Sequence, residues 1–137
     1  MSLYKDTKLG KITISDKIIT NAVMRISKKE KYNEIIWLST PKGKLLSDDD
    51  WFQSNDSVKN IEIDYNGHDD FRLKYYVIVK FGESIKTVLN HLNQEILQFI
   101  YEKTSVIPNE ICTVVTGVKS ENISHRYMEF KFSYETK

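Results

Sequence analysis

Cysteine is nearly absent from this chain: Cys112 is the only one among 137 residues. A lone cysteine excludes a disulfide within the chain and any metal site built on several thiolates, and it suits a reducing compartment. Long apolar runs are missing as well, since none approaches the ~20 residues of a membrane-spanning helix. The first residues also lack the charged and then apolar pattern of a signal peptide. We therefore expect a cytoplasmic protein.

An excess of charge of either sign is also lacking. The chain has 20 Lys and Arg against 19 Asp and Glu, which gives a net charge of +1. The field of the whole molecule therefore offers little attraction to nucleic acid or to an anionic membrane. Apolar residues make up 40% and charged residues 28%, which is ordinary for a globular protein. The length fits one domain, so we predict a single domain over residues 1–137.

The first half of the chain predicts few elements. Polar and apolar residues alternate over residues 11–15, which indicates a strand. A helix is predicted directly after it, because apolar residues recur there at helical spacing, at Ile18, Ile19, Ala22, Val23 and Ile26. A short strand is predicted over residues 34–38. Asp48, Asp49 and Asp50 precede Trp51 and Phe52 and predict the start of a short helix.

The second half is more regular. Residues 60–65 and 72–81 alternate and are separated by a turn with an Asn-Gly pair, which predicts an antiparallel hairpin. A helix follows with Ser84 as its N-cap and an apolar stripe from Ile85 to Ile100. Leu97 and Tyr101 widen this stripe and indicate a helix covered on more than one side. Further strands are predicted over residues 111–118 and 126–134.

This order predicts an α+β fold. We expect a two-layer β-α-β-β-α-β arrangement with a mainly antiparallel sheet, two long helices on one face, and an extra C-terminal strand over about residues 126–134.

Residues able to carry chemistry are few and scattered. His68, Asp69 and Asp70 could bind a cation with Asp48 to Asp50, but adjacent turn residues seldom converge on one ion, and turn formation explains them better. His91 stands four residues before Glu95, as in an ordinary exposed helical pair. No residue near His125 in the sequence could form a catalytic nucleophile and base with it. Cys112 is predicted to be buried like a small apolar residue. We therefore predict no catalytic residue, no metal site and no cofactor.

Aromatic residues are more numerous than the predicted core requires, with eight Tyr, six Phe and two Trp. An uncovered aromatic sheet face, or a last strand that forms a sheet edge, would suit a protein partner or a second copy of the chain. The candidate interaction surface comprises Trp37, Trp51, Phe52, Tyr76, Phe130, Phe132 and Tyr134. An alternative is binding of single-stranded nucleic acid or RNA, because aromatic residues beside Lys and Arg can stack bases. No substrate of low molecular weight is expected.

Three segments carry strand and turn patterns in a characteristic order. Residues 9–16 read LGKITISD, residues 76–85 read YVIVKFGESI, and residues 102–104 (EKT) are followed by residues 109–118 (NEICTVVTGV). Together they resemble the alkaline shock, or general stress envelope, protein family of Gram-positive bacteria. The first is similar to the strand with which that family begins, the second to its hydrophobic strand, aromatic-Gly turn and Ser-Ile helix start, and the third to its helix end and following strand. The family-like core thus covers about residues 9–118, and residues 30–60 and the last strand depart from the pattern.

The resemblance implies a non-enzymatic cytoplasmic protein of cell-envelope stress or homeostasis. Such a protein would gather at the membrane through a membrane-anchored partner rather than by inserting directly, and it would have no catalytic residues. Fold-level kinship is analogy where function is concerned, so this role stands as an expectation.

Overall fold

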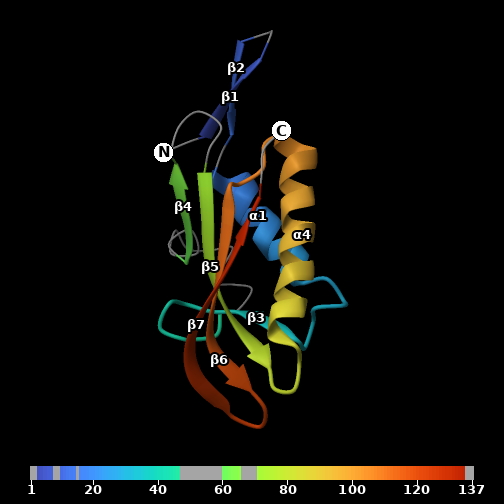
Figure 1. The fold of residues 1–137 in the computed structure, drawn as a ribbon, viewed down its shortest axis with the longest axis vertical. Helices are drawn as coiled ribbons and strands as arrows, with labels where there is room; N and C mark the ends of the chain where they lie inside the picture. The colour runs from blue at the N-terminus through green and yellow to red at the C-terminus, as the bar shows by residue number, and fades with distance from the viewer. Residues whose placement is uncertain (1–2, 8–9, 15, 47–59, 66–70, 135–137) are drawn as a thin grey trace.

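The computed structural model describes residues 3–7, 10–14, 16–46, 60–65 and 71–134 (Figure 1). Its main feature is a five-stranded mixed sheet with two helices, so the fold is α+β. The sheet comprises β3 (Ile36–Leu38), β4 (Ile61–Tyr65), β5 (Phe71–Lys80), β6 (Glu110–Lys119) and β7 (Ile123–Ser133). The helices are α1 (Asp16–Ser27) and α4 (Ile85–Thr104).

The central strands β5 and β6 are parallel, with Leu73 opposite Ile111 and Val77 opposite Val115. Helix α4 connects them, and its 20 residues return the chain by about 30 Å to the end of the sheet where β5 began. A strand–helix–strand connection of this kind makes neighbouring strands parallel. The expectation of a mainly antiparallel sheet is therefore only partly met, because the central pairing is parallel while the outer pairings are antiparallel.

Two short strands share one edge of β5. Strand β4 pairs with its first half, with Ile63 opposite Leu73, and thereby confirms the predicted antiparallel hairpin. Strand β3 pairs with its second half, with Trp37 opposite Ile78. On the other side of β5 the order continues through β6 to β7. Strand β7 therefore forms the outer border of the sheet.

Both helices cover the same face of the sheet, as Figure 1 shows. The core contains the inward stripes of α1 and α4 together with alternate residues of β5 and β6, including Ile19, Val23, Leu89, Ile96, Val77 and Val115. All of these are fully buried. Burial of such side chains contributes about 1.5–3 kcal/mol each. The predicted periodicities of both helices are confirmed.

A buried polar network fixes α4 above the central strands. The Tyr75 hydroxyl donates to Asn93 Oδ1, and Asn93 Nδ2 donates to Thr113 Oγ1 at 3.0 Å. All three residues are fully buried. Because these buried polar groups bond one another, the network offsets the cost of their desolvation and sets the position of the helix over β5 and β6.

Three sequence expectations about single elements are wrong. The strand predicted at residues 11–15 is present as β2 (Gly10–Ile14), but it does not join the main sheet. It pairs antiparallel with β1 (Leu3–Thr7), a strand that the sequence did not predict, in a separate two-stranded sheet. Phe81 lies past the end of β5 and is 70% exposed, and Tyr101 on α4 is 51% exposed. Helix α4 is thus covered on one side, not on several.

Within the described residues, no helix has the length and apolar character needed to cross a membrane.

Candidate interaction surface

Strand β7 presents a long open edge. It has 11 residues, and it pairs along one side with β6, with Phe132 opposite Ile111 and Phe130 opposite Thr113. No other strand among the described residues pairs with its outer side. Sheet edges of this kind carry a row of backbone donors and acceptors that can bind another extended chain.

The two faces of β7 differ in chemistry. Met128, Phe130 and Phe132 lie on the helix side, are half-buried, and pack against the edge of the core. Glu129 and Lys131 lie on the opposite side and are exposed. A strand added along this edge would therefore meet apolar side chains on one face and alternating charges on the other. Lysine on an edge strand also limits indiscriminate pairing.

A bulge separates the two halves of β7. Val115 pairs with Met128 and Gly117 with His125, so two residues of β7 stand opposite Thr116 alone. Thr116 Oγ1 donates to the Val77 carbonyl at 3.2 Å and lies 2.7 Å from Ser39 Oγ. Bulges bend an edge and interrupt its regular pairing. The regular part of the open edge is therefore the segment from Met128 to Ser133.

Tyr134 continues the helix-side series just after β7. It is half-buried, and its hydroxyl makes no hydrogen bond with a described residue. Burial raises the pKa of this hydroxyl to about 12, so it stays protonated at an alkaline pH where an ordinary tyrosine ionises.

The helix-free face of the sheet carries polar pairs instead of an open aromatic surface. Tyr76 is only 6% exposed and donates its hydroxyl to Glu62. Burial, and then this hydrogen bond, raise the pKa of Tyr76 far above its ordinary value. Glu129 accepts from the Tyr127 hydroxyl at 2.9 Å and lies 3.7 Å from Lys74 Nζ. Cys112 is buried beside them, as the sequence predicts.

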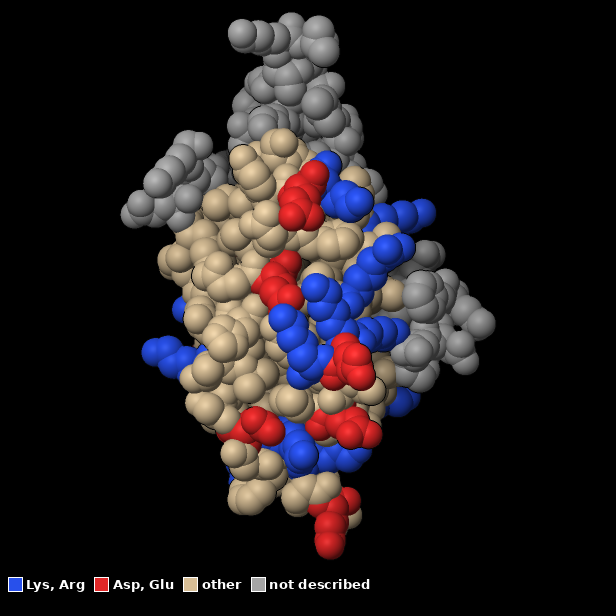
Figure 2. All heavy atoms as spheres, turned by 90° about the vertical axis from the view of Figure 1, so that its right-hand side faces the viewer, with Lys and Arg blue, Asp and Glu red and all other residues tan. Residues whose placement is uncertain are grey.

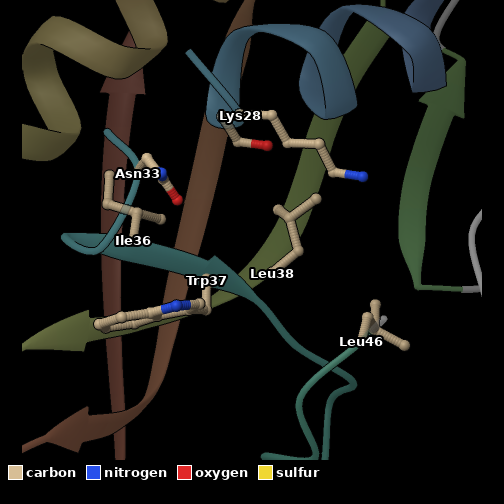
Figure 3. Close-up of a pocket in the computed structure, with 7 residues that line it drawn as sticks. Lys28, Asn33, Ile36, Trp37, Leu38 and Leu46 are labelled. Atoms are coloured by element: carbon tan, nitrogen blue, oxygen red, sulfur yellow. The ribbon is translucent and has the colours of Figure 1, made fainter. Parts of the chain in front are cut away.

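Trp37 lies at the far border of the sheet, away from β7. On β3, Ile36 and Leu38 point to one side and Trp37 to the other (Figure 3). With Lys28, Asn33 and Leu46 these residues line a pocket of about 310 Å³. The structure therefore does not bring Trp37 and Tyr76 onto one surface with Phe130, Phe132 and Tyr134, because the latter three face the helices.

A second pocket on the other side of Trp37 escaped the sequence analysis. It has a volume of about 530 Å³ and is lined by Trp37, Lys80, Phe81, Lys119, Glu34, Ser120 and Glu121. The Lys119 ammonium lies 4.6 Å from the centre of the Trp37 ring, a cation–π contact. Alternation placed Phe81 inside the strand predicted over residues 72–81, whereas β5 ends at Lys80. Gly82, directly after Phe81, was the available sequence signal of a turn there, and its φ is positive at 94°.

Two lysines after α1, Lys29 and Lys31, have a structural role. Glu95 on α4 accepts the Tyr32 hydroxyl and lies 2.8 Å from Lys31 Nζ and 3.3 Å from Lys29 Nζ. Burial raises the pKa of Glu95, but the bonds from Lys31, Tyr32 and Lys29 outweigh burial and lower it. These contacts fix the segment after α1 to α4. His91 lines an adjacent pocket with Glu95.

Charge is unevenly distributed over the helix-bearing side. Figure 2 shows Lys and Arg gathered on one part of it and a broad area without charged side chains on another. The exposed residues of α4 from Thr87 to Tyr101 include no Lys, Arg, Asp or Glu. An uncharged helix surface beside an open strand edge lowers the desolvation cost of covering that side.

The remaining predicted site residues lie outside the described part of the chain: Trp51, Phe52, the Asp48 to Asp50 run, and His68, Asp69 and Asp70. Within the described part, no group of three or more His, Cys, Asp or Glu side chains is placed to hold a metal ion.

Comparison with known proteins yields no relative: no family model, curated protein or solved structure matches this chain.

Proposed function

We propose that this protein acts by binding a protein, either a second copy of itself or another chain, through the open edge of β7, and that it catalyses no reaction. The single observation that carries the proposal is the position of β7: it borders the sheet, and its outer side is unpaired within the described residues. A partner strand would gain main-chain hydrogen bonds along this edge, while the side chains of β7 would select the partner.

The cellular role that we propose comes from the sequence resemblance alone. We propose that the protein is cytoplasmic, belongs to a divergent branch of the alkaline shock family, and serves cell-envelope homeostasis through a membrane-anchored partner. The strand edge supplies a physical means for such recruitment, since edge pairing requires no membrane insertion by this chain.

The proposal is tested by blocking the edge without removing the strand. In Lys131→Pro the ring replaces an N–H on β7, and proline is tolerated on edge strands where that N–H does not serve the sheet. Lys131→Ala is the matched control, because it removes the same charge and keeps the N–H. Both variants are checked for native circular dichroism and then used, beside the wild type, to recover partners from membrane and cytosol fractions of the host.

We expect the wild type and Lys131→Ala to retain the same partner, and folded Lys131→Pro to lose it. Equal recovery by all three variants would mean that binding does not use this edge, and the proposal would then be wrong.

A second candidate function is the binding of single-stranded nucleic acid at the pocket beside Trp37. An exposed Phe81 and two lysines, Lys80 and Lys119, surround this pocket, and bases can stack on aromatic rings flanked by cations. We expect labelled single-stranded RNA to show a salt-dependent rise in anisotropy that Phe81→Ala weakens and Lys86→Ala does not. No rise at low salt would rule this candidate out.

A further inference from the structure

The backbone of β7 presents specific residues to its open side. The Tyr134 N–H donates to the Asn109 carbonyl at 2.8 Å, so the backbone groups of Tyr134 face β6. Successive residues of a strand direct their backbone groups to opposite sides. Phe132 and Phe130 therefore also face β6, while the N–H and C=O groups of Lys131 and Glu129 face outward.

The outward segment is complementary to itself when it runs antiparallel to a second copy. We infer that β7 pairs with β7 of a second copy about a two-fold axis at Phe130, which joins two sheets into one. This inference rests on the proposed function of the edge and names its partner. In this register Glu129 stands opposite Lys131 of the second copy, and Lys131 stands opposite Glu129 of that copy. A two-fold axis makes every such pair occur twice.

Neighbouring registers that also match the outward backbone groups are poorer. An axis at Glu129 places two carboxylates opposite each other, and an axis at Lys131 places two ammonium groups opposite each other; like charges in these positions destabilise a sheet. An axis at Met128 places Glu129 opposite Tyr127, and an axis at Phe132 places Lys131 opposite Ser133. Of these five registers, only the axis at Phe130 joins opposite charges, so charge favours this register among them.

The helix side of the same register is apolar. Phe130 meets Phe130 of the second copy, and Met128 stands opposite Phe132. These are pairs without direct main-chain bonds, in which side chains approach most closely. All three residues are half-buried in the single chain, so pairing would cover apolar surface that remains open. The two α4 helices would lie on the same side of the joined sheet, and the exposed residues of each from Thr87 to Tyr101 include no Lys, Arg, Asp or Glu.

The two charges at this edge differ in the partners that they have within their own chain. Lys131 is exposed and makes no ion pair with another described residue, while Glu129 already bonds Tyr127 and lies near Lys74. Exposed ion pairs add little affinity. Their effect lies in the choice of register and partner, because a mismatch brings like charges together. A reversal of charge should therefore weaken association, and a second reversal should restore it.

The test is a charge-swap series measured by sedimentation equilibrium at low ionic strength, from low to high micromolar protein. The variants are Glu129→Lys, Lys131→Glu and the double swap; Glu121→Lys in the exposed turn before β7 is the control for charge alone. We expect the wild type, Glu121→Lys and the double swap to dimerise alike. Each single reversal should raise the dissociation constant by about tenfold or more, because it creates two like-charge pairs. Circular dichroism confirms that each variant is folded.

Three outcomes would overturn the inference. A wild-type monomer at every concentration would exclude the second copy as partner, and the proposed function would survive if Lys131→Pro still lost another protein. A dimer that tolerates both single reversals but is abolished by Lys131→Pro would keep the edge and reject the register. If none of these variants changed the dissociation constant of the dimer, both the inferred register and self-association through β7 would be wrong.

Discussion

Removal of one buried hydroxyl should show how much the polar network under α4 contributes to stability. In Tyr75→Phe the ring keeps its volume, but Asn93 Oδ1 loses the hydrogen bond that it accepts from the Tyr75 hydroxyl. Asn93 is fully buried, so water cannot replace the lost donor. A buried acceptor without a partner costs about 1–3 kcal/mol.

The loss should appear as a lower melting temperature. For a chain of 137 residues, the entropy of unfolding converts 1 kcal/mol into about 3–4 °C. We therefore expect Tyr75→Phe to melt about 4–10 °C lower, measured by circular dichroism together with urea titration. Tyr127→Phe is the matched control, because its hydroxyl bonds Glu129 on the surface and should leave the midpoint nearly unchanged.

The reasoning would be refuted if both variants melted together. That result would mean that the Tyr75 hydroxyl lies in water or has an equivalent partner, and the network could not hold α4 over the central strands. The double variant Tyr75→Phe with Asn93→Leu should lose less free energy of unfolding than the sum of the two single changes, since neighbours in one network are coupled.

Three further outcomes follow from individual residues. Gly43 has a φ of 88°, and a Cβ there would lie 2.9 Å from His125 Nδ1. Urea titration should therefore show a larger loss in the free energy of unfolding for Gly43→Ala than for Gly82→Ala, because Gly82 has a φ of 94° but open space at the Cβ position. The backbone cost that both substitutions share is about 1–2 kcal/mol. Equal losses would argue against the contact with His125. The pKa of Glu95 is lowered in the fold, so its stabilisation is present above its unfolded pKa of about 4.3 and is lost as pH falls through the lower folded value. As the pH falls through that range, the free energy of unfolding should therefore decrease less for Glu95→Gln than for the wild type or Glu102→Gln. Burial, and then Glu129, raise the pKa of Cys112, so a thiol reagent at neutral pH should label the native protein far more slowly than the protein in denaturant; equal rates would contradict the burial.

The elements with strong periodicity could be predicted from the sequence. Both long helices, the hairpin of β4 and β5, and the last strand appear close to the expected ranges, because one buried face imposes a regular spacing on each. Ser84 precedes α4 as expected, although its hydroxyl bonds the Thr87 side chain instead of capping a backbone amide. Cap chemistry depends on side-chain rotation, which residue type alone does not determine.

The candidate surface could be predicted only in part. Phe130 and Phe132 were identified as aromatic and the last strand as an edge candidate, but alternation cannot show which strands are neighbours. The open side of β7 follows from strand order, which depends on the crossover through α4. Likewise, the contact between Lys119 and Trp37 joins residues far apart in sequence, and the bulge at Thr116 shifts a register that alternation would have continued.

The central claim is that β7 binds through its outward backbone groups, and residue-resolved amide hydrogen exchange across a concentration series tests it most directly. The amides of Phe130 and Phe132 face β6 and should be protected at every concentration. The amides of Glu129 and Lys131 should exchange rapidly in dilute protein and become protected as the second copy associates. If Glu129 and Lys131 remained unprotected where sedimentation shows complete association, the edge would not be the binding surface.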